Sequence, residues 1–201
     1  MKKSAVLMAV TLMVTGAIGA QADDATYHFG SAHQRTNVTF ESQTDFETVL
    51  GSTNQIAGSI TGDTERGVGS VSIEVPVPSL DTGIEMRNDH LRSPMWLDAE
   101  KYPTIQFKSV SARKLSGTKW RIRGMFTMHG VSKELSVDAD VREIPAAAAK
   151  AAGLEDGAWV RVTAPFTVRL SEFGVKVPEM AAAKVNDTWT VKVVAFANTR
   201  G

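Results

Sequence analysis

The chain has 201 residues, with 22 basic and 22 acidic side chains, four histidines and no cysteine. The even charge balance argues against a nucleic-acid binder, which is normally basic, and no polybasic cluster suggests binding to an anionic membrane. The lack of cysteine excludes disulfides, thiol catalysis, iron–sulfur clusters and thiolate zinc sites.

The first 22 residues have the pattern of a secretory signal peptide. Lys2 and Lys3 precede an uncharged stretch over 5–20, and Ala20-Gln21-Ala22 fits the small-x-small cleavage pattern. A membrane anchor is the alternative, but threonines and glycines interrupt a run that falls short of the about 20 apolar residues of a spanning helix. We expect a signal peptide over 1–22 and a periplasmic or secreted domain over 23–201. Loss of two lysines and no acid would change the net charge from 0 to −2.

Most of the mature chain alternates apolar and polar residues, as half-buried strands do. Strands are predicted at 27–29, around Val38 and Phe40, at 56–60 and at 71–77. The apolar positions of the last of these give the clearest stripe. Pro76 cannot donate a ladder hydrogen bond, so this strand should end there or lie at an edge or bulge.

The period changes between residues 81 and 103. Asp81 and Thr82 precede apolar residues at helical spacing, and Glu85 lies three residues after Thr82, as in a capping box. Pro94 should stop this helix. We interpret the segment as a short helical cover over one mouth of a barrel.

Strands resume after this segment, at 105–107, 120–128, 135–141, 160–170 and 189–193, with a short alanine-rich helix over 145–153. One apolar and one charged face per strand is typical of antiparallel sheets. About eight such strands can close into a barrel, which removes exposed sheet edges. The sequence therefore predicts an all-β fold, an antiparallel eight-stranded β-barrel with short helices covering one end.

Four motifs then follow in order: RNDHLRS at 87–93, YPTIQF at 102–107, GMFTMHGV at 124–131 and FGV at 173–175. Together with the signal peptide they resemble the YceI-like, polyisoprenoid-binding periplasmic proteins, over most of the mature chain. The resemblance implies an extended, lipocalin-like barrel that holds a long apolar chain, such as an isoprenoid quinone or a polyprenyl phosphate, in its lumen. The family tends to have a tryptophan where this sequence has Tyr27.

Three polar side chains are candidates for contact with the head of such a ligand. Arg87 and His90 are three residues apart, so they point to nearly the same side of a helix, and the Arg87 fork suits a phosphate or carbonyl oxygen. Alternatively, Arg87 pairs with an acid such as Asp89 or Asp98, and His90 fixes the helix onto the barrel. His129, in a turn, could reach the same end or simply bond backbone carbonyls.

The apolar stripes are the candidates for contact with the tail. Many inward positions carry small residues, which leaves a barrel hard to fill at the density of protein interiors. A solid core is the alternative. The predicted lumen residues are Phe40, Ile73, Val75, Ile105, Phe107, Phe126, Met128, Phe166 and Val168.

No catalytic motif is present, and the histidines lack the local spacing of metal ligands. We expect a binding protein rather than an enzyme, with a bound isoprenoid or other long-chain lipid as ligand and no metal or other cofactor. The expected partners are this lipid and, transiently, a membrane or membrane protein, and a homodimer is compatible with the sequence. A lipid-modifying or stress-defence enzyme and an interaction module with a filled core are the alternative functions.

Overall fold

The structure is a computed structural model that describes residues 24–30, 35–154 and 156–200; the predicted signal peptide over 1–22 lies outside them. The described residues form ten strands, two α-helices and three 3-10 helices. In chain order these are β1 (Ala25–Phe29), β2 (Asn37–Gln43), β3 (Thr48–Thr53), β4 (Ala57–Asp63), β5 (Val68–Pro76), η1 (Val77–Ser79), α1 (Glu85–Arg92), β6 (Thr104–Ser116), β7 (Lys119–Met128), β8 (Val131–Ile144), α2 (Ala146–Ala151), β9 (Trp159–Arg169), η2 (Leu170–Phe173), η3 (Glu179–Ala181) and β10 (Thr188–Asn198).

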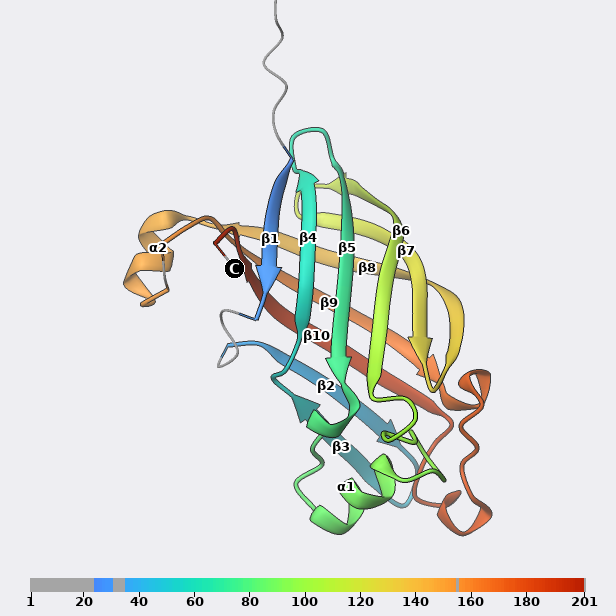
Figure 1. Cartoon of the computed structure of the whole chain (residues 1–201). Helices are drawn as coiled ribbons and strands as arrows, with labels where there is room; N and C mark the ends of the chain where they lie inside the picture. Colours follow the sequence, from blue (N-terminus) through green and yellow to red (C-terminus); the bar gives the residue numbers. More distant parts are fainter. Residues whose placement is uncertain (1–23, 31–34, 155, 201) are drawn as a thin grey trace, which may run out of the picture.

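Eight of the strands close into an antiparallel barrel in the order β1, β4, β5, β6, β7, β8, β9, β10 and back to β1 (Figure 1). The ring closes at β10. One edge of this strand pairs with β9, and the other edge pairs with β2 along one part and with β1 along another. Residues 190–194 of β10 pair with β2, whereas Ala197 and Asn198 pair with Phe29 and His28 of β1. The eight-stranded barrel is thus confirmed, and the β2–β3 hairpin extends its wall beyond the ring.

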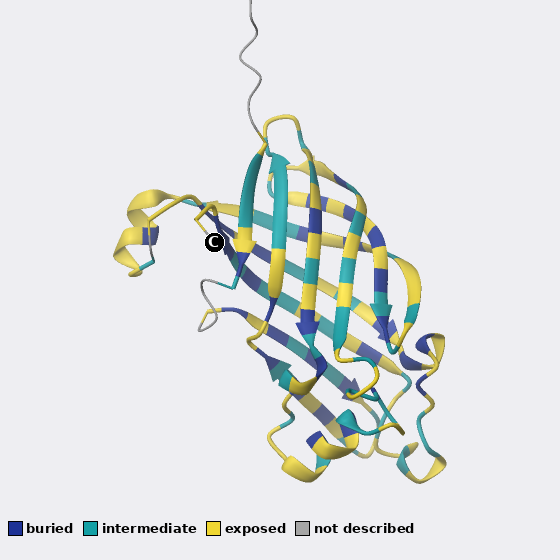
Figure 2. Ribbon diagram, viewed as in Figure 1, coloured by how far each residue is buried: buried dark blue, intermediate teal, exposed yellow. Residues whose placement is uncertain are grey.

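Alternation along the strands separates the inside of the barrel from its surface (Figure 2). In β7, Trp120, Ile122, Phe126 and Met128 are buried on one parity. The opposite parity carries charged residues that pair with β8 on the outside, such as Arg121 with Asp138 at 2.7 Å. The two-residue period predicted from the sequence therefore gives the inward face correctly.

One strand was absent from the sequence prediction. β3 has Val49, Gly51 and Thr53 on its buried parity, whereas Leu50 is 55% exposed. A stripe that includes glycine and threonine carries too little apolar character to stand out in a period-2 search. Gly51 faces Phe40 of β2, whose ring takes up the space that a side chain at 51 would need.

The helical cover forms as predicted, with a different start. α1 begins at Glu85, and no side chain caps its first turn. Instead, Asn88 reaches back from within the helix: its Oδ1 accepts hydrogen bonds from the Thr82 backbone N–H at 2.8 Å and the Thr82 hydroxyl at 2.7 Å, and its Nδ2 donates to Asp81 at 2.8 Å. The predicted capping box is therefore wrong, because Thr82 bonds to Asn88 and lies before the helix.

Replacement of Asn88 by alanine should loosen this cover. Asn88 is only 3% exposed, and its loss leaves the Thr82 groups without their shared acceptor. We expect Asn88→Ala to lower the free energy of unfolding by about 2 kcal/mol, the scale of a buried hydrogen-bonding group that loses its partners. Urea unfolding followed by circular dichroism would measure the change. The neighbouring Asp89→Ala, at an exposed position, is the matched control, and an equal loss in both variants would contradict this role.

A glycine lets β6 and β7 approach each other closely. Gly124 of β7 lies on the buried parity, and a Cβ there would fall 2.7 Å from Ser109 Cα and 2.8 Å from the Phe107 ring. The register between β6 and β7 shifts at this point, between Ser109 and Ser111. The glycine therefore accommodates a bulge, which bends the wall.

A side chain at 124 should strain this bulge. We expect Gly124→Ala to destabilise the protein by about 1–3 kcal/mol, the usual cost of forcing atoms into a packed site. Met125→Ala, one residue away on the outward face, should change stability by less than about 0.5 kcal/mol. Thermal and urea unfolding of both variants would check the difference; a neutral Gly124→Ala would mean that the strands can move apart without cost.

Candidate functional site

An elongated cavity fills the lumen of the barrel. The space in which the centre of a water-sized sphere can lie without touching protein atoms has a volume of about 200 Å³. Because one water needs about 10–15 Å³ of such space, the cavity admits on the order of 15 water- or methylene-sized groups. Its wall extends from Tyr27 and Thr64, near the β4–β5 turn, to Leu91 and Leu97, in and after α1. The interior is thus neither solid nor a wide channel.

The nine apolar residues predicted from the stripes all lie in this wall. Val75, Phe126, Met128 and Val168 are buried and belong to the large core cluster, so the cavity and the core are one continuous apolar region. The structure thus brings the predicted tail-contacting residues together. That they contact a ligand stays a prediction.

Aromatic side chains shape the part of the lumen nearest α1. Phe126 meets the edges of Phe166 and Phe173, with ring centroids 5.9 and 5.4 Å apart. On the other side, Phe40 stacks on Trp189 at 5.4 Å. These pairs fix ring positions through their quadrupoles as well as through burial.

Several wall residues were not among the predicted candidates. Some of them belong to the cover at the α1 end, which contains no strand, so alternation along strands could not identify them. The others are two tryptophans and a tyrosine whose side chains lie on the inward parity of strands. The parity was visible in the sequence for Trp120 and Trp189, but the cover residues required knowledge of the loop path. These residues are Tyr27, Leu80, Leu91, Trp96, Leu97, Trp120 and Trp189.

Arg87 and His90 do not face the cavity. Arg87 donates through Nη2 to Glu47 at 2.7 Å, which ties α1 to the turn between β2 and β3. His90 is exposed on the outer side of the helix. The acid that pairs with Arg87 lies 40 residues away and is neither of the two acids weighed from the sequence. The arrangement favours a role for Arg87 in holding the cover.

His129 also lies outside the cavity wall. It occupies the turn between β7 and β8 with a positive φ of 51°, and its Nδ1 lies 3.1 Å from the backbone carbonyl of Phe173. The Tyr102 ring meets the imidazole edge-on at a centroid distance of 4.7 Å. His129 thus joins this turn to η2 and to the segment after the cover.

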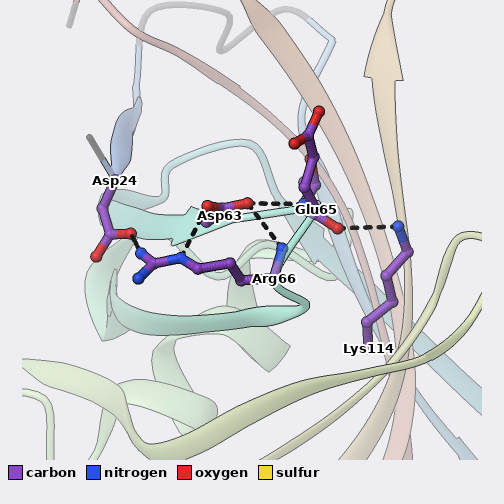
Figure 3. Close-up of polar contacts among 6 residues, drawn as sticks. Asp24, Asp63, Glu65, Arg66 and Lys114 are labelled. Carbon is purple, nitrogen blue, oxygen red and sulfur yellow. Dashed lines mark hydrogen bonds and ion pairs between the residues drawn. The ribbon is translucent and has the colours of Figure 1, made fainter. Parts of the chain in front are cut away.

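The opposite end of the cavity, at the β4–β5 turn, is polar; we call it the β4–β5 mouth. Thr64 donates its hydroxyl to Glu143 of β8 at 2.8 Å, and its carbonyl accepts from Lys114 Nζ at 3.0 Å. Arg66 bridges Asp63, at 2.8 Å, and Asp24 (Figure 3). The turn is thereby tied to three other strands or their ends.

The charges at this mouth change the proton affinity of their neighbours. Burial raises the pKa of the Tyr27 phenol, and the Glu143 carboxylate adds to the rise. Tyr27 therefore keeps its proton at neutral pH and can donate a hydrogen bond. The backbone N–H of Arg66 and the other groups that bond to Asp63 lower the pKa of that carboxyl, so it stays ionised.

Comparison with known proteins agrees with this architecture. The YceI-like domain model matches residues 27–197. The chain belongs to the YceI-like family. A UPF0312 protein of Vibrio parahaemolyticus is 30% identical over 141 residues, which cover 70% of this chain and 74% of that protein. Another, from Pectobacterium carotovorum, is 28% identical over 181 residues, which cover 87% and 88% of the two chains.

Solved structures share the fold of this YceI-like chain at low sequence identity. BcnA of Burkholderia cenocepacia superposes with a TM-score of 0.71 at 22% identity, covering 84% of this chain and all of BcnA. A domain from Saccharophagus degradans, described as polyisoprenoid-binding and implicated in plant cell wall breakdown, gives 0.63 at 15% identity, covering 88% and 99%. None of the helices in the described ranges is long and apolar enough to cross a bilayer.

Proposed function

We propose that this YceI-like protein binds a long-chain lipid of the isoprenoid type in the barrel lumen and carries or stores it outside the cytoplasm. The observation that carries the proposal is the uncharged, largely apolar cavity that runs between the two ends of a closed barrel. The polyisoprenoid-binding description of the Saccharophagus degradans domain supports the same ligand class. The signal-like pattern of residues 1–22 supports export.

Burial of the tail would supply most of the binding free energy. Each buried methylene contributes about 0.8 kcal/mol, so ten of them contribute roughly 8 kcal/mol. Association and ordering oppose this with several kcal/mol. None of the described residues that line the cavity is charged. The affinity should therefore depend strongly on tail length and little on salt concentration.

Exchange of such a lipid with a membrane would require contact between the protein and the bilayer or a membrane protein. The end covered by α1 offers large exposed apolar side chains for this contact, such as Met180 at 88% exposure. Others in the β2–β3 turn, at the start of α1 and in the loop that follows are Phe46, Ile84, Met86 and Met95. Lys184 lies over the Phe46 ring at 5.9 Å, which places η3's loop beside the β2–β3 turn.

The tail-length dependence tests the proposal directly. For a series of prenols and alkyl alcohols, we expect affinity to rise by up to about fourfold per buried methylene. The rise should level off near the roughly 15 groups that the cavity admits. Native mass spectrometry of the purified protein should also show a co-purified lipid. Absence of both the lipid and any binding of long-chain isoprenoids would refute the proposal, and product formed on incubation would indicate an enzyme.

Filling part of the lumen should weaken this binding without unfolding the barrel. Ala164 of β9 is a half-buried wall residue, so a phenylalanine there would occupy the space of a tail segment. We expect Ala164→Phe to weaken binding of a 15-carbon prenol by at least tenfold and to leave the thermal midpoint within a few degrees. Thr167→Phe, at an exposed position of the same strand, is the matched control and should bind as the unmodified protein does.

A further inference from the structure

The wall of the cavity restricts where a charged head group could lie. Among the described residues that line it, none carries an ionisable side chain other than Tyr27. An ionised group without partners costs several kcal/mol to bury, even after local relaxation. A phosphate head must therefore remain at one of the two ends of the cavity, where charged side chains are present.

The α1 end offers little to such a head. Leu91, Trp96 and Leu97 form an apolar ceiling over the cavity. Of the two arginines on α1, Arg87 is engaged by Glu47 at 2.7 Å. Arg92 donates to the Leu80 carbonyl at 3.3 Å and lies 3.7 Å from Glu85, although its buried Nε has no hydrogen-bond partner among the described residues. Arg92, with this unpartnered Nε, is the competing site at this end that the described residues point to.

The β4–β5 mouth brings several polar groups to the end of the lumen. Tyr27 and Thr64 both line the cavity, and Glu143 accepts the Thr64 hydroxyl at 2.8 Å. Glu143 is exposed and is not itself a wall residue, but it shares the strand parity of Val141, which is one, and its carboxylate reaches the wall through the bond to Thr64. Within the described chain, no protein group is hydrogen-bonded to the Tyr27 hydroxyl. One free donor and one carboxylate acceptor thus stand at the end of the apolar wall.

The net charge of this mouth is negative. Among the charged residues of the β4–β5 turn and those bonded to the turn, four carboxylates outnumber two cations, which gives this group a formal charge of −2. Both cations are already bound, Arg66 to Asp63 and Asp24, and Lys114 to the Thr64 carbonyl. The charged residues counted here are Asp24, Asp63, Glu65, Arg66, Lys114 and Glu143. A phosphate, with a charge of about −1.5 to −2 at neutral pH, would meet repulsion here.

We propose, on the basis of the lipid-binding function above, that the β4–β5 mouth binds an uncharged oxygen-bearing head, with Tyr27 as donor and Glu143 as acceptor. A carbonyl head accepts from the Tyr27 hydroxyl, and an alcohol head donates to Glu143, in place of the Thr64 hydroxyl or beside it. The ligand enters the lumen with its tail directed toward α1. The protein consequently discriminates against a prenyl phosphate that has the same tail.

Ligands that share a 15-carbon tail and differ in the head group distinguish the contribution of the head to affinity from that of the tail. Farnesol, a quinone with a three-isoprene tail, farnesyl phosphate and the hydrocarbon farnesene would be titrated into the full mature protein, with fluorescence of the wall tryptophans as readout. We expect farnesol and the quinone to bind at least tenfold more tightly than farnesyl phosphate. Tyr27→Phe should weaken the quinone about tenfold, and Glu143→Gln should weaken farnesol and bring farnesyl phosphate within about threefold of it.

Controls distinguish this inference from the function on which it rests. Glu134→Gln lies on the outer face of the same strand as Glu143, beside Arg123, and should change no head preference. Binding of farnesene alone reports the tail site: if no ligand binds, the lipid-binding function itself fails. If farnesyl phosphate binds as well as farnesol or better, the inference is overturned. Loss of that binding in Arg92→Met would then place the head at the α1 end.

Discussion

The lumen exists because β10 pairs with two strands along one edge. Among the described residues, two pairs join it to β1, at Ala197 and Asn198, and residues 190–194 pair with β2. Ala195, Ala197 and Asn198 are among the most deeply buried residues of the described chain. Without this short closure the sheet would be open, and the apolar faces that now surround the cavity would be exposed to water.

Closure and incomplete filling together make the interior suited to an apolar guest. Aromatic pairs fill the part near α1, whereas inward alanines and glycines leave room elsewhere. An empty apolar cavity loses the dispersion contacts that its wall would otherwise make. A guest that restores them stabilises the folded state by an amount that grows with the logarithm of its concentration above Kd, so stability and binding are linked through the same residues.

The sequence predicted most of the barrel but only part of its contacts. Period-2 alternation identified the inward residues, and all nine predicted lumen residues line the cavity, because strand parity depends on local chain geometry. The pairing of Arg87 with Glu47 could not be predicted, because it depends on how a hairpin and a helix 40 residues apart are placed. β3 was missed because its inward position 51 is a glycine. The ring of Phe40 on β2 fills the space beside Gly51, so β3 lacks a complete apolar stripe of its own.

The polar groups at the β4–β5 mouth were missed for a similar reason. Thr64 lies in a turn and Glu143 at the end of a strand, and each looks like an ordinary surface residue in the sequence. Only the closed ring brings β4 and β8 to the same opening, where the two side chains meet at 2.8 Å. Such non-local polar contacts leave no periodic trace in a single sequence.

The β2–β3 hairpin lies outside the eight-stranded ring, and this affects how the wall can open. Its outer strand is bridged to the rest of the chain only at Ser52 and Asp81 among the described pairings. Detachment of the hairpin would break its ladder with β10 and its contacts with the cover, such as Arg87–Glu47 and Ser52–Asp81, and would leave the ladders of the ring in place. Because Val38 and Phe40 on β2 belong to the cavity wall, this detachment would create a lateral opening into the lumen. A local opening of this kind requires less free energy than global unfolding, and it would let a tail pass while the ring stays folded.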